Sequence, residues 1–418
     1  MRSALRAAVA AVVASVCAAA GAVPAGAAEP RPGLEFVDVT ADGVKGNGHS
    51  AYPVVSAGGR HVAFLSWATN LAPGDTDSTA DVYVKDLRTG ELRWVSDVPG
   101  GQGEGVAFGT PSISADGTRV AFAALPPDTW PPRDVKLPAF VFDSRTGRTE
   151  QFDERTDPAL RKVSAPALSG NGRYVAFTGR PAGEQGAGSR VYVRDLRRDT
   201  GSWIDHPLPS GEQDLGFPTL SHDGSRVAYG VWDTGNDSGE EHEGVYVLDR
   251  RTGERTRADA DCAGDPAENW VGDPVISADG RHVAFRWKCL TRPEGSTSDT
   301  GDVFVRDVRR GTLLHIQGSK AGYATHSGRP SADARRIVFA AFESGADHPP
   351  RQVVYLRDLR TGRVELVSAR PDGTVNRRPA AHPTLDARGR VVAFDADRLD
   401  LQGEDGLGER QAFVMRVR

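Results

Sequence analysis

This sequence of 418 residues has few cysteines, little net charge and no long apolar run after its first thirty residues. Each of these shortages excludes a class of protein. It contains three cysteines, and only Cys262 and Cys289 lie outside the first thirty residues. The formal net charge is only -5, and the chain has no polybasic tract to hold nucleic acid. Beyond the first thirty residues, no apolar run approaches the roughly 18 residues of a membrane span. The chain is also longer than one compact core usually supports, although 39% of it is hydrophobic.

The first 28 residues have the pattern of a secretory signal peptide. Arg2 and Arg6 supply a positive start, and residues 7–20 form a short apolar stretch. Ala25, Gly26 and Ala27 give the small residues of a cleavage site. We therefore expect a mature, soluble, monomeric protein outside the cytoplasm, beginning near residue 29.

A repeat of about 55 residues organises everything after this leader. In each copy a serine or aspartate precedes an aromatic residue by eight positions, and the aromatic residues follow one another at intervals of 58, 55, 52, 56, 54 and 55. The seven aromatic residues are Phe64, Phe122, Phe177, Tyr229, Phe285, Phe339 and Phe394. A constant period of this size indicates a repeat architecture.

Each copy has the pattern of four short strands. A brief apolar stretch leads into an Asp-Gly-Arg turn or a variant of it, and a β-rich run follows, as in His61-Val-Ala-Phe-Leu65. A third run such as Val303-Phe-Val305 ends in an Asp-x-Arg-x-Gly turn, and a fourth run leads to the next copy. Seven such antiparallel meanders predict an all-β, seven-bladed β-propeller over residues 29–418.

The two ends of the repeat region are complementary. The seventh copy stops after its third strand, and the N-terminal stretch Glu35-Phe-Val-Asp-Val-Thr40 is similar to a fourth strand. This stretch is therefore predicted to complete blade seven and to close the ring, which removes the exposed sheet edges of an open array. Blade six departs from the pattern, because its turn reads Asp333-Ala-Arg without glycine, and we expect an irregular inner strand there.

The quoted repeats resemble the WD40-like repeats of the TolB-type β-propeller family. The signatures are Pro274-Val-Ile-Ser-Ala-Asp-Gly-Arg-His-Val-Ala-Phe285 and Asp81-Val-Tyr-Val-Lys-Asp-Leu-Arg-Thr-Gly90. The resemblance implies the propeller fold and covers residues 34–418. It does not extend to TolB's N-terminal α/β domain, for which there is no room after Ala28. Propeller peptidases carry a Gly-x-Ser-x-Gly hydrolase domain, and this motif is absent from the sequence.

Two of the four connections in each repeat are long and variable. We call the rim on which they open the long-loop rim, and the opposite one, with the Asp-Gly-Arg and Asp-x-Arg-x-Gly turns, the short-turn rim. Variable loops on a rigid frame are a usual place for binding. Five tryptophans fall on the long-loop rim, where they either bind a sugar or protein partner or cap the sheet ends: Trp67, Trp130, Trp232, Trp270 and Trp287.

Histidines provide a second candidate site on this rim. His49, His326 and His382 shortly precede the inner strands of blades one, six and seven, which are neighbours in a closed ring. Imidazoles gathered near the axis would bind a ligand or a metal ion, and the alternative is three ordinary loop residues. Oligogalacturonate-lyase-type propellers, which use a metal and histidines, make this the enzyme hypothesis to test.

Acidic residues provide a third candidate. Asp75, Asp77 and Asp81 lie at close spacing in one loop, and carboxylate oxygens are the ligands of calcium. The loop lacks the glycine and distal glutamate of an EF-hand, so a solvated acidic loop is the alternative. Cys262 and Cys289 lie on the long loops of blade five, and we expect a disulfide between them in an oxidising compartment, the alternative being two buried thiols.

The sequence favours a secreted, non-catalytic binding or scaffold protein that recognises a protein or a cell-envelope glycan through its long-loop rim. Calcium is the one cofactor considered, and no catalytic residue is assigned. Only Asp386 places a carboxylate on an inner strand, whereas glycosidases need a pair. The alternative is a lyase-like, polysaccharide-active enzyme with a histidine or metal site near the propeller axis.

Overall fold

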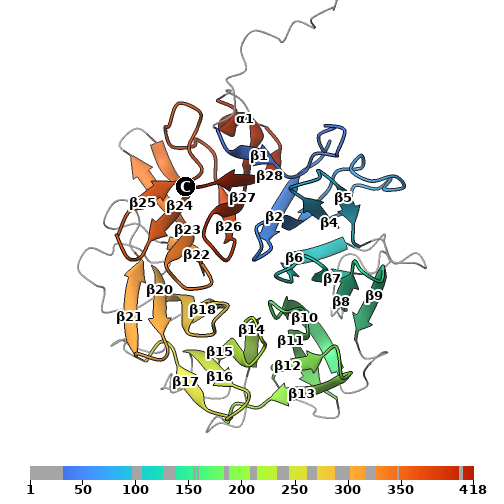
Figure 1. The fold of residues 1–418 in the computed structure, drawn as a ribbon, viewed down its shortest axis with the longest axis vertical. Helices are drawn as coiled ribbons and strands as arrows, with labels where there is room; N and C mark the ends of the chain where they lie inside the picture. Colours follow the sequence, from blue (N-terminus) through green and yellow to red (C-terminus); the bar gives the residue numbers. More distant parts are fainter. Residues whose placement is uncertain are drawn as a thin grey trace, which may run out of the picture.

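The computed structural model contains seven four-stranded antiparallel sheets arranged around a central axis (Figure 1). It describes residues 32–96, 106–125, 138–153, 157, 160–182, 188–207, 214–232, 244–260, 271–287, 302–316, 325–345, 348–403 and 408–418. This confirms the predicted seven-bladed β-propeller. Among the described residues, no helix is long and apolar enough to cross a membrane.

Each blade contributes one strand to each of four concentric positions. The innermost strands are β2 (Ser50–Val55), β6 (Val106–Ile113), β10 (Leu160–Leu168), β14 (Asp214–Leu220), β18 (Val271–Ile276), β22 (Thr325–Pro330) and β26 (Ala381–Leu385). The second strands are β3 (His61–Ser66), β7 (Arg119–Leu125), β11 (Tyr174–Pro181), β15 (Arg226–Trp232), β19 (His282–Trp287), β23 (Arg336–Gly345) and β27 (Val391–Asp397). The third strands are β4 (Asp81–Asp86), β8 (Ala139–Asp143), β12 (Arg190–Asp195), β16 (Gly244–Asp249), β20 (Asp302–Asp307), β24 (His348–Asp358) and β28 (Arg410–Arg416).

The outermost strands are shorter, and one of them comes from the other end of the chain. They are β5 (Leu92–Trp94), β9 (Arg148–Phe152), β13 (Thr200–Ile204), β17 (Arg255–Arg257), β21 (Thr312–Ile316), β25 (Val364–Leu366) and, for blade seven, β1 (Leu34–Phe36). One short helix, α1 (Arg398–Leu401), follows β27. The predicted closure is confirmed, because Leu34 pairs with Met415 and Phe36 with Phe413.

The turn between the first and second strands is held by the repeated serine. In blade five, Ser277 Oγ donates to Asp279 at 2.5 Å and accepts the backbone N–H of His282 at 2.9 Å. Gly280 takes the left-handed conformation that this turn requires, with φ of 70°. In blade seven, Asp386 replaces the serine as acceptor of a backbone N–H five residues on.

Blade six lacks the glycine of the turn between its first and second strands. Ala334 occupies the glycine position of the turn and is forced to a φ of 49°. The inner strand β22 itself has a register shift between His326 and Arg329, at the same place as the shifts in the other blades. The irregularity that the sequence predicts therefore lies in the turn rather than in the strand.

The core lies between neighbouring blades. Phe64 and Tyr83 are fully buried cross-strand partners of blade one, and they pack in one cluster with Val391 and Val414 of blade seven. Burying each such side chain stabilises the fold by about 1.5–3 kcal/mol. The same arrangement is repeated from blade to blade, which is why every repeat needs its aromatic residue.

Ion pairs and main-chain hydrogen bonds hold the short-turn rim together. Arg60 pairs with Asp86 at 2.5 Å, Arg281 pairs with Asp307 at the same distance, and both arginines hold the pKa of their partner carboxyl well below its usual range. Main-chain bonds also join the turns of adjacent blades. Ala387 N–H donates to the carbonyl of Ala57 at 3.0 Å, which links blade seven to blade one.

Candidate functional site

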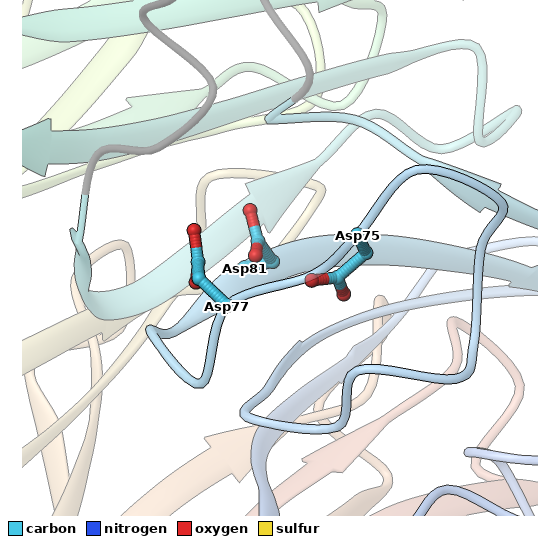
Figure 2. Close-up of side chains that lie close together, drawn as sticks. All are labelled: Asp75, Asp77 and Asp81. Carbon is cyan, nitrogen blue, oxygen red and sulfur yellow. The ribbon is translucent and has the colours of Figure 1, made fainter.

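The predicted acidic cluster forms in the loop between β3 and β4 and at the first residue of β4. Asp75, Asp77 and Asp81 each place a carboxylate oxygen within 4.8 Å of the other two, and Figure 2 shows the three side chains around this loop. Asp75 and Asp81 are buried, and Asp77 is half-buried. Three carboxylates at this spacing offer the all-oxygen donors that calcium prefers.

Hydrogen bonds hold each carboxylate of this cluster in place. Asp81 accepts the indole N–H of Trp94 at 2.8 Å and the hydroxyl of Ser96 at 2.6 Å. Asp75 accepts the hydroxyl of Tyr83 from the neighbouring strand. The Asp77 carboxylate accepts a backbone N–H and a hydroxyl from the residue two positions on. In each carboxylate these bonds go to one oxygen, and the other oxygen is the one that a cation would contact.

Burial and mutual repulsion both oppose the charges of the cluster. Desolvation raises the pKa of Asp81 to about 7, and the neighbouring carboxylates Asp75 and Asp77 add to that rise against the hydrogen bonds from Ser96 and Trp94. Burial likewise raises the pKa of Asp75. A bound cation would offset both effects, so the donor chemistry fits calcium.

Two of the three predicted histidines, His49 and His382, are connected to one hydrogen-bonded network. His382 Nδ1 lies 2.7 Å from Asp395, a carboxylate with no exposed surface, and Arg410 also donates to that carboxylate. His49 is connected to the same network, because its Nδ1 accepts the backbone N–H of Arg410 at 3.2 Å. His326 lies in β22, but its side chain is outside the described part of the chain, so the three-histidine site stays a prediction.

The same place contains a strained aromatic contact. The rings of Tyr52 and His382 have centroids 4.1 Å apart, and Tyr52 donates its backbone N–H to Asp395 at 2.9 Å. Tyr52 and His382 both have a positive φ, of 55° and 49°. Bulky residues rarely adopt this region, and each costs on the order of 1–3 kcal/mol unless its surroundings enforce it.

The predicted tryptophans have different surroundings. Trp67 is half-buried and packs on the core between blades one and two, as the sheet-capping alternative expects. Trp232 forms an edge-to-face pair with Phe217, whose side chain is 46% exposed. Four further predicted residues, Trp130, Trp270, Cys262 and Cys289, lie outside the described residues, as does the side chain of Trp287. The disulfide therefore stays a prediction.

Sequence reasoning missed four residues of this region: Tyr52, Phe217, Asp395 and Arg410. One signal was available for Asp395, because the residue after the repeated aromatic is uncharged in most blades. The equivalent positions are Leu65, Ala123, Thr178, Gly230, Arg286 and Ala340. Tyr52 and Phe217 each directly precede the proline of an inner strand, as His382 does.

Comparison with known proteins supports the fold alone. No protein-family model and no curated protein matches this chain. The β-propeller domain of the Trilobed protease from Pyrococcus furiosus is similar with a TM-score of 0.58 and 13% identity, over 88% of this chain and 94% of that one. An oligogalacturonate lyase from Vibrio parahaemolyticus has a TM-score of 0.54 and 12% identity, over 95% and 92% of the two chains. TolB from Acinetobacter baumannii has a TM-score of 0.41 and 14% identity, over 82% and 78%.

Proposed function

We propose that this protein is a secreted, non-catalytic binding or scaffold protein that contacts a protein or a cell-envelope glycan through its long-loop rim. One observation carries the proposal. The short-turn rim repeats nearly the same turn in every blade, apart from Ala334 and Asp386, and pairs its own charges, as in Arg60 with Asp86; the acidic cluster and the variable loops lie toward the opposite rim. Irregular side chains on a rigid frame are where recognition usually resides.

The acidic cluster would give this rim a calcium-dependent loop. Asp75, Asp77 and Asp81 would hold the ion with their second carboxylate oxygens, and the ion would fix the loop between β3 and β4. A loop ordered in this way loses less conformational entropy when a partner binds. Calcium would act as a structural ion, with no reaction routed through it.

A matched pair of charge reversals tests which rim binds. Asp77→Lys changes the long-loop rim, and Glu91→Lys changes the short-turn rim, where the Glu91 side chain is 64% exposed. The immobilised protein is exposed to the culture medium of its own source and to isolated cell envelope, and bound material is quantified by mass spectrometry and sugar analysis. We expect Asp77→Lys to reduce capture several-fold and Glu91→Lys to leave it unchanged. Equal capture by both variants would contradict the assignment of the rim.

A lyase-like activity on a polysaccharide is the second candidate, and one observation favours it. His382 has its Nδ1 on a buried carboxylate, which leaves Nε2 as the acceptor of a proton, the arrangement of an oriented general base. Incubation with acidic polysaccharides and detection of unsaturated products tests this activity. Unchanged chain lengths across the panel would exclude it for those substrates.

A further inference from the structure

The outer turns of the short-turn rim carry exposed arginines. We use the name outer turn for the connection between the third and fourth strands of a blade, and Figure 1 shows these strands at the circumference of the ring. All outer turns lie at the same end of their blades, so their side chains share one face of the protein. Six arginines occupy the same position of the outer turn in blades one to six: Arg88, Arg145, Arg197, Arg251, Arg309 and Arg360.

The aspartate that begins each outer turn is paired with a different arginine. Asp86 pairs with Arg60 at 2.5 Å in blade one, and an equivalent pair occurs in each of the next five blades. These aspartates therefore compensate the arginines near the first turn of the blade, and the outer-turn arginines remain in excess. For example, the side chains of Arg88 and Arg360 have no ion pair within the described part of the chain.

Few other acidic residues of the outer turns remain to balance this charge. Glu91 pairs with Arg93 at 3.4 Å, Asp199 pairs with Arg194, and Glu254 is the third. The aspartates of the first turns lie between the first and second strands, on the inner side of the blades, so the excess positive charge lies at the circumference. The whole chain has a net charge of -5, so its acidic excess lies elsewhere.

The arrangement of this charge indicates what it can bind. A guanidinium group pairs with a phosphate through two parallel hydrogen bonds. Arginines around the edge of one face can contact an extended anionic surface at several points, whereas a small anion would reach one turn. Among the described residues, the exposed large hydrophobic side chains are Val44, Phe217 and Leu314, and none of them lies in an outer turn. The outer turns therefore offer no ring on which nucleic-acid bases could stack.

We propose that the short-turn rim binds the surface of an anionic phospholipid bilayer through its outer-turn arginines. The inference goes beyond the proposed function and does not depend on it. A protein bound in this way directs its long-loop rim away from the bilayer, where a partner has access to it. The attraction is Coulombic, and it is screened as the Debye length falls from about 10 Å at 0.1 M salt to about 3 Å at 1 M. Capture by the long-loop rim can therefore be measured separately at high salt.

The sequence conceals this surface because the repeat separates the arginines. They follow one another at intervals of about 55 residues, so no polybasic tract appears in the chain. Ring formation places them on one face.

Sedimentation with lipid vesicles tests this surface. The probes are phosphatidylcholine vesicles with and without about one third phosphatidylglycerol, at about 0.1 M and about 1 M salt. The variant Arg309→Gln with Arg310→Gln removes two exposed charges from the outer turn of blade five. Arg180→Gln with Arg378→Gln is the matched control, because it removes two exposed charges outside the outer turns. Circular dichroism melting of both variants checks that the fold is unchanged.

We expect the unmodified protein to bind the phosphatidylglycerol vesicles at low salt only, and not to bind phosphatidylcholine alone. An arginine near an anionic membrane contributes about fivefold in affinity, so the outer-turn variant should bind at least fivefold more weakly and the control equally well. No binding to the anionic vesicles, binding that persists at high salt, or equal loss in both variants would overturn the proposal. Binding to double-stranded DNA or polyphosphate without binding to vesicles would overturn the lipid assignment. The vesicles contain no protein or glycan, so none of these results bears on the long-loop rim.

Discussion

Asp38 is a buried acid on the segment that closes the ring, and replacing it with asparagine should stabilise the protein at neutral pH. It lies two residues beyond the end of β1 and has no exposed surface. Within the described residues, neither of its carboxylate oxygens has a hydrogen-bond donor, and the amide oxygen of the nearby Gln411 has none either. Val37 donates to Ala412, which places Asp38 opposite Gln411 on the two paired strands.

The size of the expected gain in stability follows from the pKa of the Asp38 carboxyl group. Burial raises the pKa of Asp38 from 3.8 to about 6. The Ser50 hydroxyl lies near the carboxylate but bonds to Ser66 at 3.0 Å, and it and the charges of Lys45 and Arg398 offset only part of that rise. A group whose pKa is raised by folding contributes stability below its unfolded pKa and loses it as pH rises through the folded value. Roughly two pKa units correspond to about 3 kcal/mol, lost between pH 4 and pH 7.

Urea unfolding of the wild type and Asp38→Asn at pH 4 and pH 7.5 measures this loss directly. We expect the two proteins to differ little at pH 4, and the variant to gain up to about 3 kcal/mol at pH 7.5. Asp372→Asn is the control, because Asp372 is exposed and hydrogen bonds from Thr374 lower its pKa, so no gain is expected. A variant that instead loses stability at pH 7.5 would show that Lys45 and Arg398 hold Asp38 as a stabilising anion, and the reasoning would fail.

Three further changes have defined outcomes. Calcium should raise the melting temperature more at pH 8 than at pH 6, because Asp81 has a pKa of about 7 and must be ionised to bind, and Asp77→Asn should weaken that shift in differential scanning fluorimetry. Ala334→Gly should stabilise the protein by about 1 kcal/mol in urea unfolding, since it relieves a φ of 49°; a loss of stability would refute this. Gly230→Ala should cost about 1–3 kcal/mol and change the tryptophan fluorescence, because its Cβ would lie 2.6 Å from the indole of Trp232.

The fold could be predicted because its determinants repeat. The aromatic position of Phe285 is aromatic in all seven copies, and the serine and glycine positions of Ser277 and Gly280 are kept in six of the seven each, so one local pattern is observed several times. Closure by β1 followed from the absence of a fourth strand in the last copy, and the pairing of Phe36 with Phe413 confirms it. The irregularity of blade six was correctly located in the repeat but assigned to the wrong element, because the effect of Ala334 stays within its turn.

The site was less predictable because its contacts join residues far apart in sequence. Asp75 and Asp77 lie in one loop and Asp81 begins the strand that follows it, so their convergence could be anticipated from spacing alone. Tyr52 and Asp395, by contrast, meet across the junction of the first and last blades. No local pattern identifies such a contact, although Asp395 is the one acidic residue among the seven equivalent positions and so marks its blade.

The pairing of β1 with β28 also constrains how the protein folds. Its partners Leu34 and Met415 are separated by roughly 380 residues, so ring closure is the contact of highest sequence separation and is expected to form late and slowly. Until then, β28 presents an unpaired edge to which another chain can add. Aggregation should therefore compete with folding chiefly before β1 pairs with β28. Once the ring has closed, we expect unfolding to begin with the separation of these two strands.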